Sequence, residues 1–329
     1  MILIIDADGL CFKAYYALEN KVDYPMCVGV PRSIIKLYND FNPTSIALVF
    51  DSEDKELSKI YPDYRKDREE PWDLGKEDYE YLLSILVLIG LPVYKDDREA
   101  DRIIASIVNL NKNKDIIIYS DDKDFFQLLS SNIKQFSETR GNIYITPKDV
   151  EKQFKIPNNT LFREYLIFNG DNVDRIPRIL SQEETLQVIK TKGKLEDWFF
   201  KKDFKDLPKQ IQSKLNNKYE QVEINYKLVN LLDDKEKPKL FKSKIKNLDY
   251  IIKRTYIREE DMEKLKSIAN KLKPIFKESQ IVEKYLEKFN ALNLDKQSAR
   301  IFQIEVLYRN GRRRNFGTVK MLPGMRWEK

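Results

Sequence analysis

Three short apolar segments, each followed closely by aspartate, constrain this chain more than any other feature of its sequence. The segments and their acids are Ile2–Ile5 with Asp6, Ile46–Phe50 with Asp51, and Ile116–Tyr119 with Asp121 and Asp122. Helical patterns separate them, at Pro31–Tyr38, Glu77–Ile89 and Ala100–Leu110. Short, fully apolar strands that alternate with helices are typical of a parallel sheet covered on both faces. We therefore expect an α/β fold with a central, mostly parallel sheet.

The acids at the strand ends are expected to lie together. Ligands of open parallel sheets bind in the crevice beyond the carboxyl ends of the strands. More acids stand in three later turns, at Glu99 and Asp101, at Asp122 and Asp124, and at Asp171 and Asp174. Taken singly, each has a simpler explanation, because acids cap helices and favour their positive N-terminal ends. Gathered at one edge, they repel one another and must be protonated or hold cations.

The histidine and cysteine content limits the chemistry that remains. The chain has no His and two Cys. This excludes a zinc site of Cys and His, and it excludes Ser–His–Asp and Cys–His catalysis. Hydrolysis would have to use carboxylates, a metal that they bind, Lys or Tyr. Oxygen ligands favour Mg²⁺, with Mn²⁺ as a substitute, and two such ions can activate water against a phosphodiester.

The overall charge is mildly basic, with 59 Lys and Arg against 53 Asp and Glu. Such a surplus permits nucleic-acid binding but does not argue for it. No basic region precedes the first apolar run, so we expect no signal peptide. The largely uncharged stretch Tyr79–Tyr94 is too short for a bilayer of about 30 Å. We expect a cytoplasmic protein with reduced cysteines and no membrane attachment.

The second half of the chain is expected to be helical from Pro147 onward. Helical patterns occur at Leu161–Phe168, around Lys201–Lys218 and at Glu259–Lys288. Near the end, Glu305–Tyr308 is a candidate strand and Arg312–Arg314 a candidate turn. The stretch from Glu305 to Lys329 holds seven Lys and Arg against two acids. It is either a contact for nucleic acid or a replication partner, or a solvated tail.

Six short motifs follow one another along the first part of the chain. They are ILIIDADG at Ile2–Gly9, ALVFD at Ala47–Asp51, YPDYRKDR at Tyr61–Arg68, READ at Arg98–Asp101, SDDKDFFQLL at Ser120–Leu129 and GDNVDRIP at Gly170–Pro177. In this order they resemble the 5′-nuclease (flap endonuclease-like) superfamily, whose members include the 5′-nuclease domain of bacterial DNA polymerase I, phage 5′-exonucleases and the RNase H of T-even phages. Each motif alone has low specificity, but six in order are a strong signal over roughly Ile2 to Ile189.

The resemblance implies a two-ion metal site of eight acids: Asp6, Asp51, Glu99, Asp101, Asp122, Asp124, Asp171 and Asp174. Asp124, Asp171 and Asp174 would serve the second ion and the others the first. The YPDYRKDR segment would be an arch over the site, where Arg65 or Lys66 contacts the scissile phosphate and Lys13 adds a phosphate contact. Nucleic-acid contacts are expected from Tyr61, Tyr64, Arg68, Arg175, Arg178, Lys190, Lys192 and Lys194.

The fold that the resemblance implies is a PIN-like 5′-nuclease core with a helical C-terminal domain. We expect a catalytic domain at 1–155 with an arch at about 53–75, a helical DNA-binding domain with a helix–turn–helix-type element at 156–275, and a C-terminal helix and basic tail at 276–329. The implied activity is 5′-3′ exonuclease, flap endonuclease or RNase H activity in DNA replication. The expected partners are DNA with 5′ ends or flaps, RNA–DNA hybrids, and single-stranded-DNA-binding or clamp proteins. We expect a monomer.

Two departures from the family pattern stand out. Arg102 occupies a position where the family often has another acid, which leaves one metal contact to Asp121 or Asp8. After Ile176-Pro177 the usual glycine-rich turn is absent, so binding of duplex DNA would depend instead on Arg175, Arg178, Lys190, Lys192 and Lys194.

Two other functions are open from the sequence. Asp6-Ala7-Asp8-Gly9 also fits a haloacid dehalogenase-type phosphatase, in which Asp6 is the nucleophile and Asp8 the acid or base. That reading requires a strand before Gly170, where the sequence favours a helix. A catalytically impaired nucleic-acid-binding relative is the other alternative, and Arg102 is its support.

Overall fold

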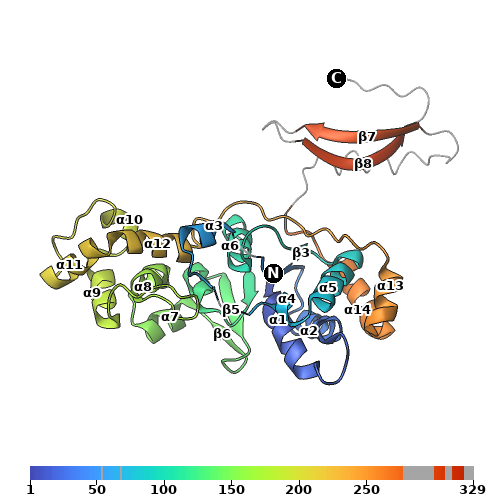
Figure 1. Cartoon of the computed structure of the whole chain (residues 1–329), viewed down its shortest axis with the longest axis horizontal. Coiled ribbons are helices and arrows are strands. Elements are labelled where there is room, and N and C mark those ends of the chain that lie inside the picture. The colour runs from blue at the N-terminus through green and yellow to red at the C-terminus, as the bar shows by residue number, and fades with distance from the viewer. Residues whose placement is uncertain (53–54, 67–68, 277–299, 308–312, 322–329) are drawn as a thin grey trace. The chain divides into compact units, whose positions relative to one another are not determined.

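The structure, a computed structural model, describes residues 1–52, 55–66, 69–276, 300–307 and 313–321. The chain divides into two compact units, Met1–Ile275 and Phe276–Lys329. A six-stranded sheet forms the centre of the first unit (Figure 1). Its strands are β1 (Ile2–Asp6), β2 (Ser45–Val49), β3 (Val93–Tyr94), β4 (Ile116–Tyr119), β5 (Ile133–Ser137) and β6 (Ile143–Ile145).

The sheet has the order β3-β2-β1-β4-β5-β6. All neighbouring pairs are parallel except β5 and β6, which are antiparallel. β1 lies between β2 and β4, so that Ile5 is in register with both Leu48 and Tyr119. The carboxyl ends of these three strands therefore meet at one edge of the sheet.

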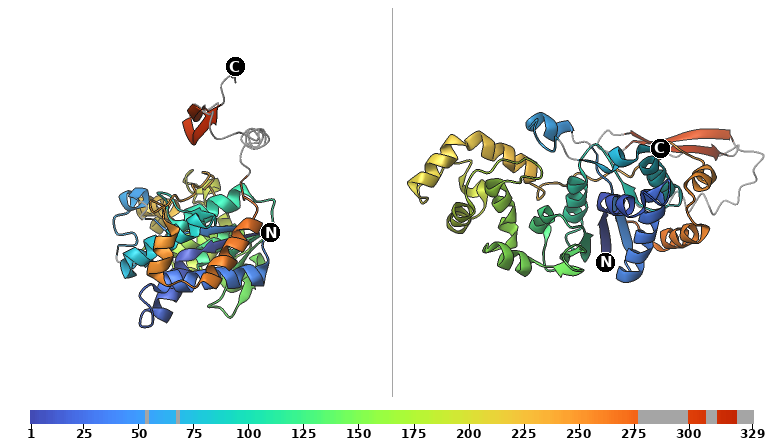
Figure 2. Two further views of the ribbon diagram at one scale, coloured as in Figure 1. Left: turned by 90° about the vertical axis from the view of Figure 1, so that its right-hand side faces the viewer. Right: turned by 60° about the horizontal axis from the view of Figure 1, so that its bottom comes forward.

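Helices cover both faces of the sheet, which explains why the central strands are apolar throughout (Figure 2). Leu3 and Ile5 on β1 join one buried cluster with residues of α1 (Ala7–Leu18), α2 (Pro25–Phe41) and α5 (Lys76–Leu88). On the opposite face, α6 (Ala100–Leu110) packs against β1 and β2. The predicted mostly parallel α/β fold is confirmed.

Polar side chains hold the covering helices in place. The buried carboxylate of Asp78, on α5, accepts hydrogen bonds from the backbone N–H groups of Met26 and Cys27 at 2.7 and 3.0 Å. These groups lie in the first turn of α2, where N–H groups have no partner inside the helix. The helices α1 and α2 approach closely at Gly29, where a Cβ would lie 2.5 Å from that of Ala14.

The remaining helices of the first half are short. They are α3 (Lys55–Ile60), α4 (Pro71–Leu74), the 3-10 helix η1 (Lys123–Leu128) and α7 (Pro147–Phe154). The chain then forms a helical part with η2 (Asn159–Leu161), α8 (Phe162–Asn169), α9 (Gln182–Lys192), α10 (Leu195–Trp198), α11 (Lys209–Asn217), α12 (Tyr219–Val229), α13 (Leu248–Thr255) and α14 (Glu259–Lys271).

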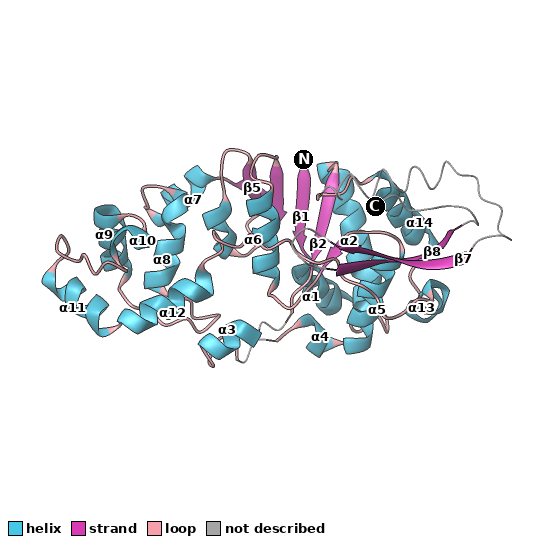
Figure 3. Cartoon of the chain, turned by 90° about the horizontal axis from the view of Figure 1, so that it is seen from above, coloured by secondary structure: helices cyan, strands magenta, loops and turns pink. Residues whose placement is uncertain are grey.

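The helical second half packs in two places (Figure 3). Helices α9 and α12 pack against α8, on the side of the unit that is farther from β3. In contrast, α13 packs against α5 and α14 against α2, so residues 248–271 return to the first half of the chain. A single helical domain at 156–275 does not account for the packing of α13 and α14 against helices of the first half. In the described part of the chain no helix has the length and apolar character needed to cross a membrane.

The second unit contains two described strands, β7 (Arg300–Leu307) and β8 (Arg313–Met321), which pair antiparallel. The predicted strand at Glu305–Tyr308 overlaps β7. The predicted turn at Arg312–Arg314 is wrong for Arg313 and Arg314, because both lie in β8. Residues 277–299, where the C-terminal helix was expected, lie outside the described residues.

Candidate metal centre

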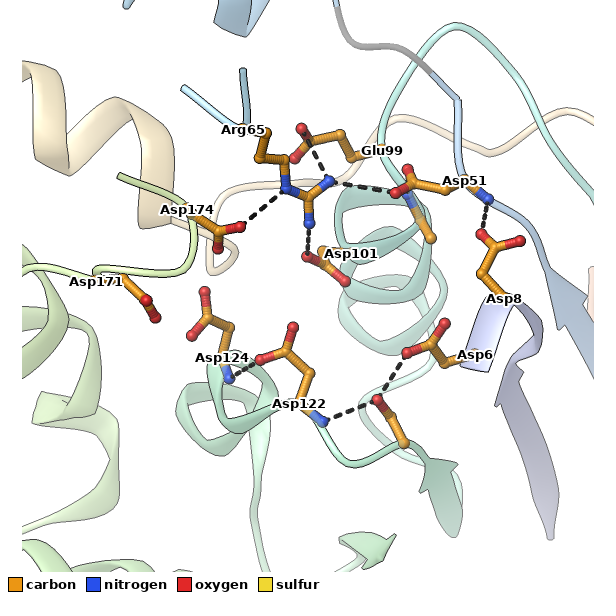
Figure 4. A network of polar contacts seen from close by, with 12 residues as sticks. Asp6, Asp8, Asp51, Arg65, Glu99, Asp101, Asp122, Asp124, Asp171 and Asp174 are labelled. Carbon is orange, nitrogen blue, oxygen red and sulfur yellow. Dashed lines mark hydrogen bonds and ion pairs between the residues drawn. The ribbon is translucent and has the colours of Figure 1, made fainter. Parts of the chain in front are cut away.

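Eight acidic side chains surround a common space beyond the carboxyl edge of the sheet (Figure 4). They come from the end of β1, the residues after β2 and β4, the start of α6, the 3-10 helix η1 and the loop after α8. They are Asp6, Asp51, Glu99, Asp101, Asp122, Asp124, Asp171 and Asp174. The structure thus places together all eight acids that the sequence singled out. An open cleft beside them is lined by Asp6, Asp51, Asp101 and Asp122.

Backbone and hydroxyl groups orient the acids at the strand ends. The carboxylate of Asp51 accepts hydrogen bonds from the N–H groups of Ala100 and Ser52, at 2.8 and 2.9 Å. The Ser120 hydroxyl donates to Asp6 at 2.8 Å and accepts from the N–H of Asp122 at 3.1 Å. The hydrogen bond between Ser120 and Asp6 therefore links the ends of the neighbouring strands β4 and β1.

A tight loop presents the last two acids. Asp171 and Ile176 exchange two backbone hydrogen bonds, of 2.9 and 2.6 Å, and this closes residues 171–176 into a loop. Gly170 precedes it with φ +71°, and a Cβ there would lie 2.5 Å from the Ile176 carbonyl oxygen. Only glycine fits this conformation and this space. The Gly-Asp-x-x-Asp spacing thus has a direct structural cause.

The guanidinium of Arg65 lies among four of the acids. It pairs with Asp51 at 3.2 Å, Glu99 at 3.1 Å, Asp101 at 3.3 Å and Asp174 at 3.2 Å (Figure 4). Its side chain is 10% exposed, and its backbone has φ +51°. The N–H of Arg65 also donates to the Asp174 carbonyl at 3.4 Å. The predicted arch residue therefore reaches into the acidic site itself.

Two residues beside the acids, Tyr64 and Lys123, each contact one of them. The buried hydroxyl of Tyr64 donates to Glu99 at 3.0 Å, and the ammonium of Lys123 pairs with Asp171. Burial raises the pKa of Tyr64 well above its usual value, and the nearby Glu99 adds to this effect. Tyr64 was expected to contact nucleic acid, but its burial leaves little of its ring for a base. It positions Glu99 instead.

Three acids of the site, Asp101, Asp122 and Asp124, retain protons more readily than free carboxylic acids do. Burial raises the pKa of Asp101, Asp122 and Asp124, and repulsion from neighbouring carboxylates adds to the shift of each. Burial and the charges of Asp51 and Asp6 do the same for Asp8. Negative charge in this space is thus only partly compensated by Arg65 and Lys123. A cation that entered it would be stabilised.

The residues fit a hard divalent cation by the chemistry of their donors. All the donors are carboxylate oxygens, which Mg²⁺ and Mn²⁺ prefer. One of them, Oδ1 of Asp124, is buried and has no hydrogen-bond partner among the described residues. Within the described residues, no group of three or more acids is arranged to hold one ion. Arg65 and Lys123 pair with acids of this set, and a metal ion at the same oxygens would compete with both cations.

The other predicted phosphate contacts lie outside the acidic space. Lys66 is 61% exposed and lies 3.6 Å from Asp63. Lys13 pairs with Glu138 at 3.1 Å and with Asp121 at 3.4 Å at the rim of the cleft. Tyr61 is half-buried just after α3. Arg68 lies outside the described residues.

Neither expected substitute for the missing acid faces the site as a free ligand. Asp121 accepts hydrogen bonds from the Ser137 hydroxyl and the Thr139 N–H, besides pairing with Lys13. Asp8 accepts from the N–H of Asp51 and from the Tyr79 hydroxyl. Arg102 itself pairs with Asp234 at 3.3 Å and donates to the Lys227 carbonyl at 2.7 Å. These two contacts join α6 to α12 and to the segment that follows α12.

The basic residues expected to grip duplex DNA divide into two groups. Arg175, Arg178, Lys190 and Lys194 are exposed. The side chain of Lys192 is only 6% exposed, and its ammonium lies 2.9 Å from Asp206 and 3.5 Å from Asp203. This expectation is therefore corrected, because Lys192 is engaged within the helical part. In place of a glycine-rich turn, the N–H groups of Ile179 and Leu180 donate to the Phe168 carbonyl.

The geometry does not favour the phosphatase alternative. Its final motif requires a strand before Gly170, but the preceding element is helix α8. Its acid or base, Asp8, is only 7% exposed and already accepts two hydrogen bonds.

Comparisons with known proteins agree with this geometry. Residues 1–155 match the model of the 5′-3′ exonuclease, N-terminal resolvase-like domain. The chain is 28% identical over 244 residues to a 5′-3′ exonuclease of Aquifex aeolicus, which covers 70% of this chain and 81% of that protein. It is also 28% identical over 244 residues to the flap endonuclease Xni of Shewanella halifaxensis. That match covers 70% of this chain and 93% of Xni.

Among solved structures, the fold is similar to that of the bacteriophage T5 D15 protein co-crystallised with metal ions. The TM-score is 0.60 at 18% identity, over 82% of this chain and 97% of that one. The T5 D15 flap endonuclease has also been solved with DNA and metal ions, with a TM-score of 0.59. The resemblance seen in the six motifs is confirmed: residues 1–155 match the 5′-3′ exonuclease family model, and the chain is similar to 5′-3′ exonucleases and flap endonucleases over 70% of its length.

Proposed function

We propose that this protein hydrolyses phosphodiester bonds at 5′ ends or flaps of DNA or RNA–DNA hybrids, with two divalent metal ions. The observation that supports this most is the convergence of eight acids, from distant parts of the sequence, on one space beyond the sheet edge. A phosphatase or a simple binding module does not require that arrangement. The match of residues 1–155 to the 5′-3′ exonuclease family model gives independent support for the reaction.

The eight acids would hold the ions, with Asp124, Asp171 and Asp174 nearer the second and the remaining acids nearer the first. Once bound, the ions would supply an activated water and stabilise the leaving oxygen. The protein's own contribution is to fix the ligands: Ser120 orients Asp6, the Ala100 N–H orients Asp51, and Gly170 closes the loop of the last two acids. Mg²⁺ is the ion that we propose.

Cations near the site would hold the scissile phosphate. Arg65 is the strongest candidate, because its guanidinium already lies within 3.3 Å of acids at the centre of the site. A metal ion that takes over those carboxylates would leave Arg65 to bind a phosphate oxygen. Lys13, at the rim of the cleft, and the exposed Lys66 would contact phosphates farther along the strand. Tyr61 would supply a ring at the base of the arch.

The duplex part of the substrate would lie along the helical part, on the exposed side chains of Arg175, Arg178, Lys190 and Lys194. Contacts of this kind bind the phosphate backbone and position the substrate without reading its sequence. We further propose a cytoplasmic monomer that removes RNA primers or flaps during DNA replication, bacterial or phage-directed, where single-stranded-DNA-binding or clamp proteins are its candidate partners.

A gel assay with four labelled substrates tests this function. A 5′ flap, a nick, a gap and an RNA-primed duplex are each incubated with Mg²⁺ or with EDTA. We expect Mg²⁺-dependent release of 5′ products. Asp122→Asn and Asp171→Asn should each abolish cleavage while binding is largely retained. Unchanged cleavage by both variants would contradict the assignment, and a phosphate trapped on Asp6 would favour the phosphatase instead.

A further inference from the structure

A second groove lies beside the acidic cleft, and the residues assigned to catalysis do not line it. It lies between helices α4 and α5 on one side and residues 241–245 on the other. Its lining combines aromatic rings with lysines: Trp72, Tyr79, Phe241, Lys95, Lys242 and Lys244. Lys76 and two acids, Asp73 and Glu80, complete the charged lining, so cations outnumber acids by four to two.

The far wall of the groove is fixed to the sheet. The N–H of Phe241 donates to the Val93 carbonyl at 2.8 Å, which attaches the segment to strand β3. The hydroxyl groups of Ser243 and Ser84 lie 2.9 Å apart and join the segment to α5. Because both walls belong to the same packed unit, the groove is built before any ligand arrives.

Lysine and aromatic rings are in direct contact at its centre. The ammonium of Lys95 lies 4.9 Å from the ring centroid of Trp72 and 5.4 Å from that of Tyr79. The ring of Trp72 is only partly buried. Rings that accept bases, interleaved with cations that accept phosphates, are the combination by which proteins bind single strands.

One side chain separates this groove from the acidic cleft. The Tyr79 hydroxyl accepts a hydrogen bond from Lys95 at 3.4 Å and donates one to Asp8 at 3.2 Å, and Asp8 lines the cleft. Ser52 lines the groove, whereas its neighbour Asp51 lines the cleft. The groove and the cleft are therefore adjacent, with Tyr79 between them.

We propose that this groove binds the single-stranded part of the substrate, with bases stacked on Trp72 and Phe241 and phosphates on Lys95, Lys242 and Lys244. The identification of the strand as substrate rests on the proposed nuclease function. Paired bases hide their faces in the duplex, so a ring set in a groove selects unpaired ones. An acidic peptide would satisfy the lysines but would leave the rings without a stacking partner.

Cross-linking and binding of the full chain in EDTA test the groove without requiring cleavage. Single-stranded DNA that carries 5-iodouracil should cross-link to Trp72 or Phe241, as mapped by mass spectrometry. Trp72→Ala should weaken binding of the strand by roughly 5- to 100-fold, as expected for the loss of a stacked base. The double variant Lys242→Ala, Lys244→Ala should show a weaker salt dependence of binding. The slope of the logarithm of the binding constant against the logarithm of the salt concentration should become less steep by roughly 0.7 for each phosphate contact that is lost.

The matched control is Lys201→Ala with Lys205→Ala, which removes the same charge from exposed lysines elsewhere. It should leave binding unchanged. Cross-links only outside the groove, an equal loss in the control, or equally effective competition by polyglutamate would each overturn the proposal. Because Lys242 and Lys244 are exposed, their variant tests it even where Trp72→Ala does not fold. Wild-type cleavage of a flap with Mg²⁺ is scored separately, so the groove and the nuclease function can fail independently.

Discussion

Replacing Arg65 by alanine tests how the protein compensates its own acidic site. In the structure this guanidinium forms four ion pairs of 3.1 to 3.3 Å and is 10% exposed. Removing one partner of a buried ion pair leaves uncompensated charge and costs about 3–5 kcal/mol. For a unit of this size we expect the melting temperature in EDTA to fall by about 6–20 °C.

Divalent metal should reverse this loss, because it takes over the charge that the guanidinium compensates. Thermal melts in EDTA and in Mg²⁺ measure both effects, and we expect Mg²⁺ to raise the melting temperature of Arg65→Ala more than that of the wild type. Lys66→Ala is the matched control, since Lys66 is 61% exposed and should contribute no more than about 1 kcal/mol. If Arg65→Ala melts like the wild type in EDTA, or gains no more from Mg²⁺ than the wild type does, then Arg65 does not compensate the charge of the acids.

Three further predictions follow from other contacts. Burial raises the pKa of Asp8 and Asp124, so the stability that their protonation provides is complete at low pH and is lost as the pH rises above about 4. The stabilisation of the protein by Mg²⁺, measured as the shift in melting temperature, should therefore grow with pH. A shift that stays constant with pH would contradict this. Gly170→Ala should abolish Mg²⁺ binding and cleavage with the helical circular dichroism retained, whereas Gly193→Ala, at a similar φ of +69° but with open space around it, should keep both. Arg102→Ala should destabilise the protein by about 1–3 kcal/mol in a denaturant titration without weakening Mg²⁺ binding, and a metal defect would place Arg102 in the site.

The sequence predicted the sheet and the gathering of the acids for one physical reason. Parallel strands bring their carboxyl ends to one edge, so acids that follow Ile5, Phe50 and Tyr119 are neighbours whatever lies between them in the chain. Helix α6 was predicted with the bounds that it has, because its apolar spacing is regular and acids open it. These features depend on local pattern alone.

Contacts between distant side chains could not be predicted in this way. Nothing in the YPDYRKDR segment distinguishes Arg65, which reaches the acids, from Lys66, which faces solvent. The burial of Tyr64 and the pairing of Lys192 with Asp206 depend on tertiary packing. The packing of α13 and α14 against helices of the first half also depends on tertiary structure. The groove at Trp72 depends on residues 241–245, which precede α13.

Direct measurement of bound metal tests the proposed two-ion centre. Mn²⁺ is titrated into the full chain and followed by electron paramagnetic resonance, with Asp122→Asn, Asp171→Asn and the exposed-site variant Lys66→Ala in parallel. We expect the wild type and Lys66→Ala to bind two ions, and each Asp variant to lose at least one of them. Absence of bound Mn²⁺ in the wild type, or the same stoichiometry and affinity in the Asp variants, would contradict a metal centre built from these acids.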